Sequence, residues 1–486
     1  MRARSLAALT LVLTLTALAA TLPAQTPAVS RYIKTSAPRI LLTHVRVIDG
    51  TGAAPLEDQA ILIEAGKIAS ITASSAPAPK ADTVLDLTGD TIFPGLVGMH
   101  DHLYYIARPN ITVSPAVSFE EPLVVPQMPF SAPRLYLAAG VTTIRTTGSV
   151  EPYADLNLKR EIDAGRLIGP HLDVTGPYLE GPNSPFLQMH NLAGPDDARA
   201  MVDYWAAQGV TSFKAYMNIT RAELKAAIDE AHKLGLKVTG HLCSVTYPEA
   251  AELGIDDLEH GFWVNTQLDP GKQPDKCASS VGTPTLVHMD PDGPEATALI
   301  RTLVDHHVAV TSTLPVFEPR VAGRPPLRPQ VLATMTPQAR EDYLLVRNRS
   351  FEHPNPDGAT MFAHNLALER RFVAAGGLLL AGPDPTGNGI VLPGFGDQRE
   401  VELLVEAGFT PLEAIRIATL NGATFLNRQA TIGSIAQGKN ADLVVVKGNP
   451  AAKISDIENV EIVFKDGIGY DSAKLFESVK GRFGQY

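Results

Sequence analysis

Cysteine is nearly absent from this sequence, which contains only Cys243 and Cys277 among its 486 residues. Two cysteines cannot build the disulfide framework that stabilises small secreted domains, so the fold must depend on a hydrophobic core. Whether a single disulfide bond joins them is left open, because the sequence does not show whether their backbones come within about 7 Å of each other.

Basic residues are too few to form a nucleic-acid surface. The chain has 41 Lys and Arg residues against 52 Asp and Glu residues, and its formal net charge is -11. Phosphate backbones require a positive footprint, so we expect no nucleic-acid partner. Hydrophobic residues make up 45% and charged residues 19% of the chain, which excludes a mainly disordered protein. The composition favours a globular enzyme with small substrates.

No apolar run reaches the roughly 20 residues that a membrane-spanning helix needs. The run from Leu6 to Ala20 has 15 residues, follows Arg2 and Arg4, and is followed by small residues up to Ala24. This layout is typical of a signal peptide, here residues 1–24. We therefore expect a protein that is periplasmic or secreted and has no membrane contact after cleavage. A retained N-terminal anchor is the alternative.

Short β-branched segments stand near both ends of the chain and predict a small β-sandwich domain, residues 25–93 and 428–486. These segments are Arg39–Asp49, Ala60–Glu64, Lys67–Thr72, Val84–Leu87, Ala441–Lys447 and Val460–Lys465. The domain would close around a central insertion.

Residues 94–427 alternate apolar strand-like runs with helical segments, the pattern of βα units and a parallel sheet. The clearest unit runs from Thr211 to Leu242. Its helix is predicted to begin after Thr220, an N-cap with Glu223 three residues later, and to end before Gly235. The predicted fold is α/β, a TIM-like (β/α)8 barrel with the small β-sandwich domain.

Metal-ligating residue types stand where the predicted strands end. His100 and His102 follow the run TIFPGLV and, at i and i+2, face the same way on a strand. Alone, this pair is a weak signal. Four further residues, however, lie in or at the ends of later strands: Lys214, His241, His260 and Asp384. Because a barrel places its active site at the carboxyl ends of its strands, we expect these side chains to meet.

Lys214 lies inside an apolar strand, where desolvation lowers the pKa of an ammonium group. A neutral lysine can react with carbon dioxide to give a carbamate, an anionic oxygen ligand able to bridge two divalent metals. A structural ion pair with Asp384 or another carboxylate is the alternative interpretation.

Together these motifs resemble the amidohydrolase superfamily, in particular the branch near prolidase-like and Xaa-amino-acid dipeptidases, imidazolonepropionase-related proteins and ochratoxin-degrading amidohydrolases. The resemblance also includes the tail TPLEAIRIATLNGATFL followed by IGSIAQGKNADLVVV, and covers nearly the whole mature chain.

The resemblance implies two divalent metal ions, which we expect to be zinc. His100, His102 and Asp384 would hold the more buried metal, His241 and His260 the more exposed one, and a carboxylated Lys214 would bridge them. Pro383 replaces the usual threonine before Asp384, which leaves the substrate rather than the metals in question. Deaminase relatives usually lack the strand-four lysine, which disfavours deamination.

This ligand set implies hydrolysis of an amide bond by a metal-bridging hydroxide. Asp384 would carry the proton to the leaving nitrogen, with His190 as the next candidate. Tyr216, on the face of Lys214, is a candidate donor to the oxyanion, although packing is an equal alternative. Tyr178, Glu180 and His190 are candidate substrate contacts in a loop over the barrel mouth. Cys243 is expected to be an inert buried thiol rather than a metal ligand.

The predicted substrate is a small peptide or N-acyl amino acid. A cyclic amide or lactone is the alternative within the enzyme class, and a non-catalytic, metal-stabilised binding protein is the alternative outside it. Residues 315–377 form a connection longer than usual and carry Arg320, Arg324 and Arg328, which predicts recognition of a substrate carboxylate. Solvated loop arginines are the alternative. A homo-oligomer is left open.

Overall fold

The structure is a computed structural model that describes residues 26–104, 111–113, 117–119, 125–182, 184, 186–386 and 390–484, with only the backbone of 111–113 and 117–119. The predicted signal peptide, residues 1–24, lies outside the described residues. Among the helices of the described part, none combines the length and the apolar character that a membrane span requires.

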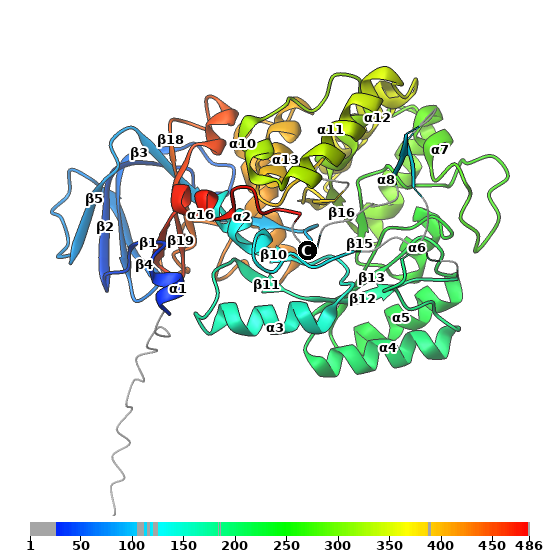
Figure 1. The fold of residues 1–486 in the computed structure, drawn as a ribbon, viewed down its shortest axis with the longest axis horizontal. Coiled ribbons are helices and arrows are strands. Elements are labelled where there is room, and N and C mark those ends of the chain that lie inside the picture. The colour runs from blue at the N-terminus through cyan, green and yellow to red at the C-terminus, as the bar shows by residue number, and fades with distance from the viewer. Residues whose placement is uncertain are drawn as a thin grey trace, which may run out of the picture.

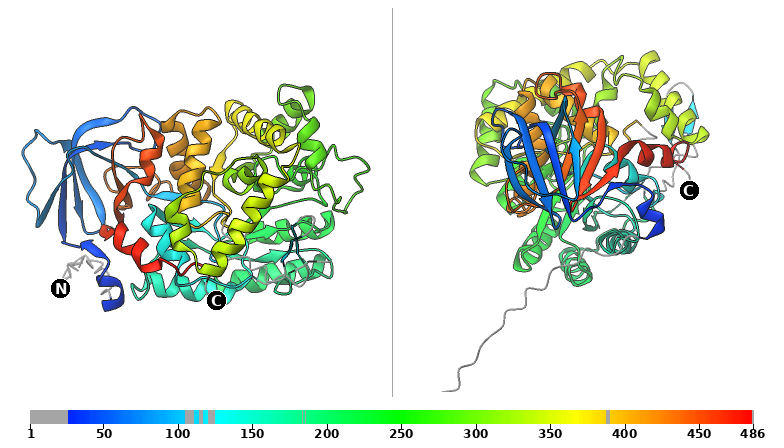
Figure 2. Two further views of the ribbon diagram at one scale, coloured as in Figure 1. Left: turned by 45° about the horizontal axis from the view of Figure 1, so that its top comes forward. Right: turned by 90° about the vertical axis from the view of Figure 1, so that its left-hand side faces the viewer.

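Strands from both ends of the chain form one nine-stranded sheet, seen as neighbouring blue and red strands in Figure 2. The order is β1-β20-β19-β18-β6-β2-β3-β4, with β5 beside β2. The strands are β1 (Ile33–Thr35), β2 (Arg39–Val47), β3 (Leu56–Glu64), β4 (Lys67–Ala73), β5 (Thr83–Asp86), β6 (Asp90–Pro94), β18 (Leu443–Lys447), β19 (Val460–Lys465) and β20 (Ile468–Asp471). The antiparallel pair β6 and β18 joins the two chain ends. The exact domain boundaries stay a prediction.

Parallel strands carry the central part of the chain. They are β7 (Leu96–Gly98), β10 (Val141–Arg145), β11 (His171–Asp173), β12 (Thr175–Leu179), β13 (Ser212–Ala215), β14 (Lys237–Gly240), β15 (Asp257–Glu259), β16 (Ala309–Ser312) and β17 (Leu379–Ala381). β11 and β12 are separated only by Val174, so the nine strands occupy eight positions. Every pairing among them is parallel. The predicted α/β class and strand succession are confirmed.

The strand ladders do not close into an unbroken barrel. They form two arcs, β11-β10-β7 and β12 through β17. Isolated backbone hydrogen bonds cross between the arcs. At one seam the amide of Met99 donates to Ala381 O at 2.8 Å and that of Asp384 to His100 O at 3.0 Å, and at the other the amide of Ser149 donates to Gly176 O at 3.0 Å. The arcs therefore lie side by side at both seams, and the strand ladder of the predicted TIM-like barrel is interrupted at these two points.

Helices surround the parallel strands (Figure 1). The longer ones are α3 (Pro152–Asp163), α4 (Pro195–Gln208), α5 (Arg221–Lys233), α8 (Pro294–Asp305), α11 (Pro337–Glu352), α12 (Gly358–Ala374), α13 (Phe395–Glu406) and α16 (Ser472–Val479). The shorter helices and turns are α1 (Pro27–Ser30), α2 (Ala132–Ala138), α6 (Tyr247–Leu253), α7 (Thr283–His288), α9 (Leu314–Phe317), η1 (Glu318–Arg320), α10 (Pro329–Thr334), α14 (Pro411–Arg416), η2 (Ile417–Asn421), α15 (Gly422–Phe425) and η3 (Ile454–Glu458).

Helix α5 begins as its sequence predicts. Thr220 Oγ1 accepts a hydrogen bond from the amide of Glu223 at 3.2 Å, and Glu223 Oε2 accepts one from the amide of Thr220 at 2.9 Å. This capping box satisfies two amides that a helix start leaves without partners. The helix fixes the chain between β13, which carries Lys214, and β14, which leads to His241.

Candidate active site

Six side chains predicted from the sequence meet at the carboxyl ends of the parallel strands. His102 Nε2 lies 3.2 Å from Asp384 Oδ1, and Lys214 Nζ lies 3.1 Å from His100 Nε2. The rings of His100 and His260, and those of His260 and His241, have centroids 4.4 Å apart. We refer to these six residues, His100, His102, Lys214, His241, His260 and Asp384, as the metal cluster.

The backbone at the metal cluster is held in uncommon conformations. His260 has φ 72° and Asp384 has φ 51°, values that residues other than glycine rarely adopt. A Cβ at Gly382 would come within 2.2 Å of the His100 amide nitrogen, so the approach of β17 to β7 requires glycine there. Such strain often occurs at functional sites.

A buried charge network holds the outer nitrogen of His100. His100 Nδ1 lies 2.8 Å from Glu259 Oε2, and the guanidinium of Arg145 donates to Glu259 Oε1 at 3.0 Å and to Asp257 Oδ2 at 2.9 Å. These four side chains are at most 1% exposed. A carboxylate behind a histidine fixes the ring so that its other nitrogen faces the cavity. Sequence reasoning missed this network, although charged residues within the apolar strands TTIRTT and DDLEH were a signal.

We expect Glu259→Gln to weaken metal binding by about 10- to 100-fold, because the ring of His100 loses the carboxylate that orients it. Competition with a chelator would measure the affinity. Asp257→Asn is the matched control, since it also removes a partner of Arg145 but does not touch His100. If both variants bound metal equally well, Glu259 would have no orienting role.

The cluster fits a divalent metal. His100, His102 and Asp384 each offer a ligand atom, and these atoms all lie within 4.8 Å of one another. His260 Nδ1 contacts Thr313 Oγ1 at 2.9 Å, whereas the buried Nε2 has no hydrogen-bond partner among the described residues. A buried nitrogen without a partner is costly, and a metal bond would satisfy it. Imidazole and carboxylate ligands suit zinc.

Burial shifts the nitrogen groups of the cluster toward their neutral forms. It lowers the pKa of Lys214 to about 8 and that of His241 to about 3. Burial alone would raise the pKa of Asp384, but the neighbouring His100 and His102 outweigh it, so that pKa lies below its usual value. Neutral imidazoles and an ionised carboxylate are the forms that bind metal.

Of the two other predicted catalytic residues, Tyr216 lies at the metal cluster and His190 does not. Tyr216 lines the same cavity as the cluster, and its ring lies 4.9 Å from that of His241. His190 lies elsewhere: its Nε2 contacts Asp197 Oδ2 at 2.8 Å, its side chain is 52% exposed, and it does not line the cavity. The placement of His190 therefore gives no support to a role in proton transfer.

Two tyrosines lie beside the metal cluster. One of them, Tyr104, was not predicted from the sequence. Tyr104 stacks on His102 with centroids 4.4 Å apart, and its hydroxyl lies 2.6 Å from that of Tyr178. Tyr178 was a predicted substrate contact and does line the cavity. Glu180 instead accepts hydrogen bonds from the amides of Gly181 and Asn218 at 2.8 Å, so it holds the loop.

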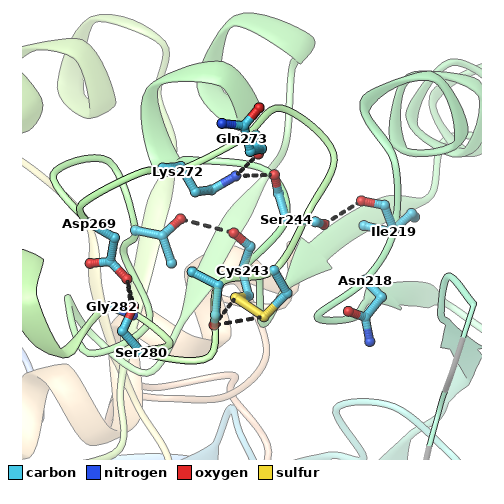
Figure 3. The surroundings of a disulfide bond; sticks show 12 residues. Asn218, Ile219, Cys243, Ser244, Asp269, Lys272, Gln273, Ser280 and Gly282 are labelled. Carbon is cyan, nitrogen blue, oxygen red and sulfur yellow. Dashed lines mark hydrogen bonds between the residues drawn. A yellow bond between two sulfur atoms is a disulfide. The ribbon is translucent and has the colours of Figure 1, made fainter.

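The two cysteines form a disulfide bond, with Cα atoms 4.8 Å apart. Cys243 is therefore not the free buried thiol that its position suggested. Thr266 Oγ1 donates to Cys243 O at 2.9 Å, and Lys272 Nζ donates to Ser244 O at 2.6 Å, so further bonds join the same loop to this strand end (Figure 3). The bridge ties the loop to the segment just after His241.

A second group of possible metal ligands lies outside the cavity. His171 Nε2 is 3.2 Å from Asp466 Oδ2 and 3.9 Å from Asp442 Oδ2. Both carboxylates attract the buried ammonium of Lys465, although desolvation dominates and lowers its pKa. An ion-pair network between β11 and the large sheet accounts for this group. The sequence gave no sign of it, because the residues lie far apart in the chain.

Comparison with known proteins gives local matches of sequence. Residues 394–468 match the model of the amidohydrolase family. An imidazolonepropionase of Mycolicibacterium smegmatis is 42% identical over 65 residues, 13% of this chain and 16% of the relative. An uncharacterized protein of Mycobacterium bovis is 29% identical over 197 residues, 39% of this chain and 49% of the relative. The chain thus matches less than half of the length of either curated relative.

The match of fold extends over most of the chain. The crystal structure of a Xaa-Pro dipeptidase with bound methionine superimposes with a TM-score of 0.63 at 20% identity, covering 89% of this chain and 100% of that one. The family model covers a segment after the metal cluster, whereas the match of fold covers 89% of the chain. Residues 394–468 thus match the amidohydrolase family in sequence, and the chain shares the fold of the solved Xaa-Pro dipeptidase.

Proposed function

We propose that the protein is a metal-dependent hydrolase that cleaves the amide bond of a dipeptide or an N-acyl amino acid. One observation carries the proposal: five of the six predicted metal ligands line one cavity of about 90 Å³ at the carboxyl ends of the strands, and the sixth, His100, lies directly behind them, 3.1 Å from Lys214 Nζ. The solved Xaa-Pro dipeptidase, whose fold this chain shares, supports a peptide-like substrate. Export through residues 1–24 is part of the proposal.

Two divalent metals, when bound, would polarise a carbonyl and lower the pKa of water. His100, His102 and Asp384 would hold one of them, and His241 and His260 the other. Lys214 in its carbamate form would reach both. Its place supports this role, since it is 1% exposed and lies against His100.

Asp384 is the side chain best placed to move a proton. Its carboxylate lies beside His102 and is 14% exposed, and the residue lines the cavity where a substrate would lie. A carboxylate there can accept a proton from the attacking water and give it to the leaving nitrogen. Tyr216 lines the same cavity and remains a candidate donor to the developing oxyanion.

Two of the three arginines proposed to bind a carboxylate already have acidic partners. Arg324 pairs with Glu318 and Glu406, and Arg328 pairs with Glu458. These pairs occupy the guanidinium groups that a substrate would need. Arg324 and Arg328 are therefore no longer candidates for substrate recognition.

Arg320 forms no ion pair with a described residue. Its guanidinium carbon lies 5.6 Å from the ring of Phe317 and 5.7 Å from that of Trp263. Phe317 in turn lies 5.6 Å from the ring of His260, so Arg320 stands one aromatic ring away from the metal cluster. It is the remaining candidate for a substrate carboxylate.

The zinc-loaded protein should hydrolyse N-acyl amino acids and dipeptides much faster than their C-terminal amides. Arg320→Met should raise KM for the acid about tenfold, because a charge-assisted hydrogen bond is lost, and leave the amide unchanged. Arg301→Met, at an exposed site on α8, is the control. Steady-state kinetics of the unmodified protein and both variants with the acid and the amide measures these differences. Equal cleavage of acid and amide would reject carboxylate recognition and favour a cyclic amide or lactone, and absence of all turnover would favour a binding protein.

A further inference from the structure

We propose that the cavity beside the metal cluster selects a substrate with an uncharged apolar side chain, such as leucine, methionine or phenylalanine, next to the scissile bond. The inference rests on the proposed function and adds the substrate class. It comes from those residues of the cavity wall that are not metal ligands. Arg320 is not among them.

The wall of the cavity beside the metal cluster is apolar and aromatic. It consists of Tyr104, Val125, Val150, Tyr178, Phe186 and Met189. The first four are at most 6% exposed and form one buried hydrophobic group, against which Phe186 and Met189 pack. Four separate parts of the chain, at positions 104, 125, 150 and 178–189, thus supply one apolar surface.

Polar groups of this wall already have partners. The hydroxyls of Tyr104 and Tyr178 lie 2.6 Å apart and bond to each other. Thr386, at the edge of the cavity, donates to Asp384 O at 3.3 Å. Among the described residues, the only lysine, arginine or acidic side chains in the lining are Lys214 and Asp384 of the cluster itself. Among these residues, a charged substrate group would find no counter-charge that the metals do not use.

The wall is held in place without a ligand. Gln188 accepts a hydrogen bond from the amide of Val125 at 2.9 Å and donates one to its carbonyl at 2.8 Å, which ties Val125 to the loop of Phe186 and Met189. A Cβ at Gly148 would lie 2.5 Å from the ring of Tyr178, so this ring is tightly enclosed. A preformed cavity with this lining discriminates between substrate groups by their polarity.

Burial in this cavity has opposite consequences for the two kinds of side chain. An apolar group gains from leaving water, whereas a charged group loses its hydration and finds no partner. We therefore expect kcat/KM for substrates with leucine, methionine or phenylalanine to exceed that for aspartate or lysine by at least about 100-fold. The substrates compared differ only in the residue on one side of the scissile amide bond. A preference for apolar residues on either side supports the inference.

Two substitutions that introduce a carboxylate test whether the apolar wall causes the substrate preference. Met189→Glu should lower kcat/KM for the leucine substrate at least about tenfold and shift the ratio toward lysine, because it places a carboxylate in the wall. Leu187→Glu is the matched control: it adds the same charge to the same loop, but Leu187 is 74% exposed and outside the lining. It should leave the preference unchanged. Thermal unfolding of both variants checks that the fold is kept.

Binding separates this inference from the proposed function. Calorimetry of the zinc-loaded protein with N-acetyl-leucine, N-acetyl-aspartate and N-acetyl-lysine needs no turnover. Tighter binding of N-acetyl-leucine, lost in Met189→Glu but not in Leu187→Glu, supports the apolar cavity even if no amide is hydrolysed. Equal binding of all three compounds, or equal effects of the two variants, overturns it even if amides are hydrolysed.

Discussion

Asp384→Asn is expected to lower kcat by about 100- to 10,000-fold while KM changes little, because an amide can contact a metal but cannot accept the proton. The carboxylate lies 3.2 Å from His102 Nε2 and faces the cavity, so no other described acidic side chain shares its position. Steady-state kinetics of the zinc-loaded variant measures the loss.

Metal content distinguishes proton transfer from metal binding in this variant. If Asp384→Asn holds as much zinc as the unmodified protein and still loses turnover, the carboxylate acts on the proton. Near-normal activity across pH would assign the proton transfer to another group. His190 is not that group by its position, since its ring faces Asp197 at the surface.

Lys214→Ala is expected to lower kcat/KM by at least about 1,000-fold, because the site would lose the oxygen ligand that a carbamate supplies, worth several kcal/mol of charge stabilisation. A short carboxylic acid such as propionate should restore part of the activity by filling the space of the lost side chain. Activity with and without added propionate measures the rescue.

Lys225→Ala provides the comparison for that experiment. Lys225 lies on the exposed face of α5, pairs with Asp229 and is remote from the cavity, so its loss should change nothing. A fully active Lys214→Ala variant would remove the carbamate from the mechanism. Loss of activity without any rescue would favour a structural role for the buried ammonium.

Local sequence patterns predicted the parts of the molecule that depend on neighbouring residues. The capping box at Thr220 predicted the start of α5, and the alternation of strands and helices predicted the parallel order. The spacing of His100 and His102 predicted that both rings lie on one side. The two rings are 5.2 Å apart, although both residues follow β7 and are not part of it. Placing Lys214, His241, His260 and Asp384 beside them required only the rule that parallel strands end at the same edge.

Contacts between distant segments were beyond prediction. Glu259 lies behind His100 although 159 residues separate them. The arginines of the long connection looked free in sequence, but Glu406 and Glu458, which lie far along the chain, neutralise two of them. The apolar wall also combines four segments, none of which is distinctive alone. Such pairings depend on the packed fold, and no local pattern encodes them.

Elemental analysis of the purified, zinc-reconstituted protein tests the central claim most directly. The account predicts close to two zinc ions per chain, with fewer in Lys214→Ala, because the four histidines, Asp384 and the modified lysine together suit two ions. A value near zero, unchanged by substitution of His100 or Asp384, would contradict a metal-dependent hydrolase at this cluster.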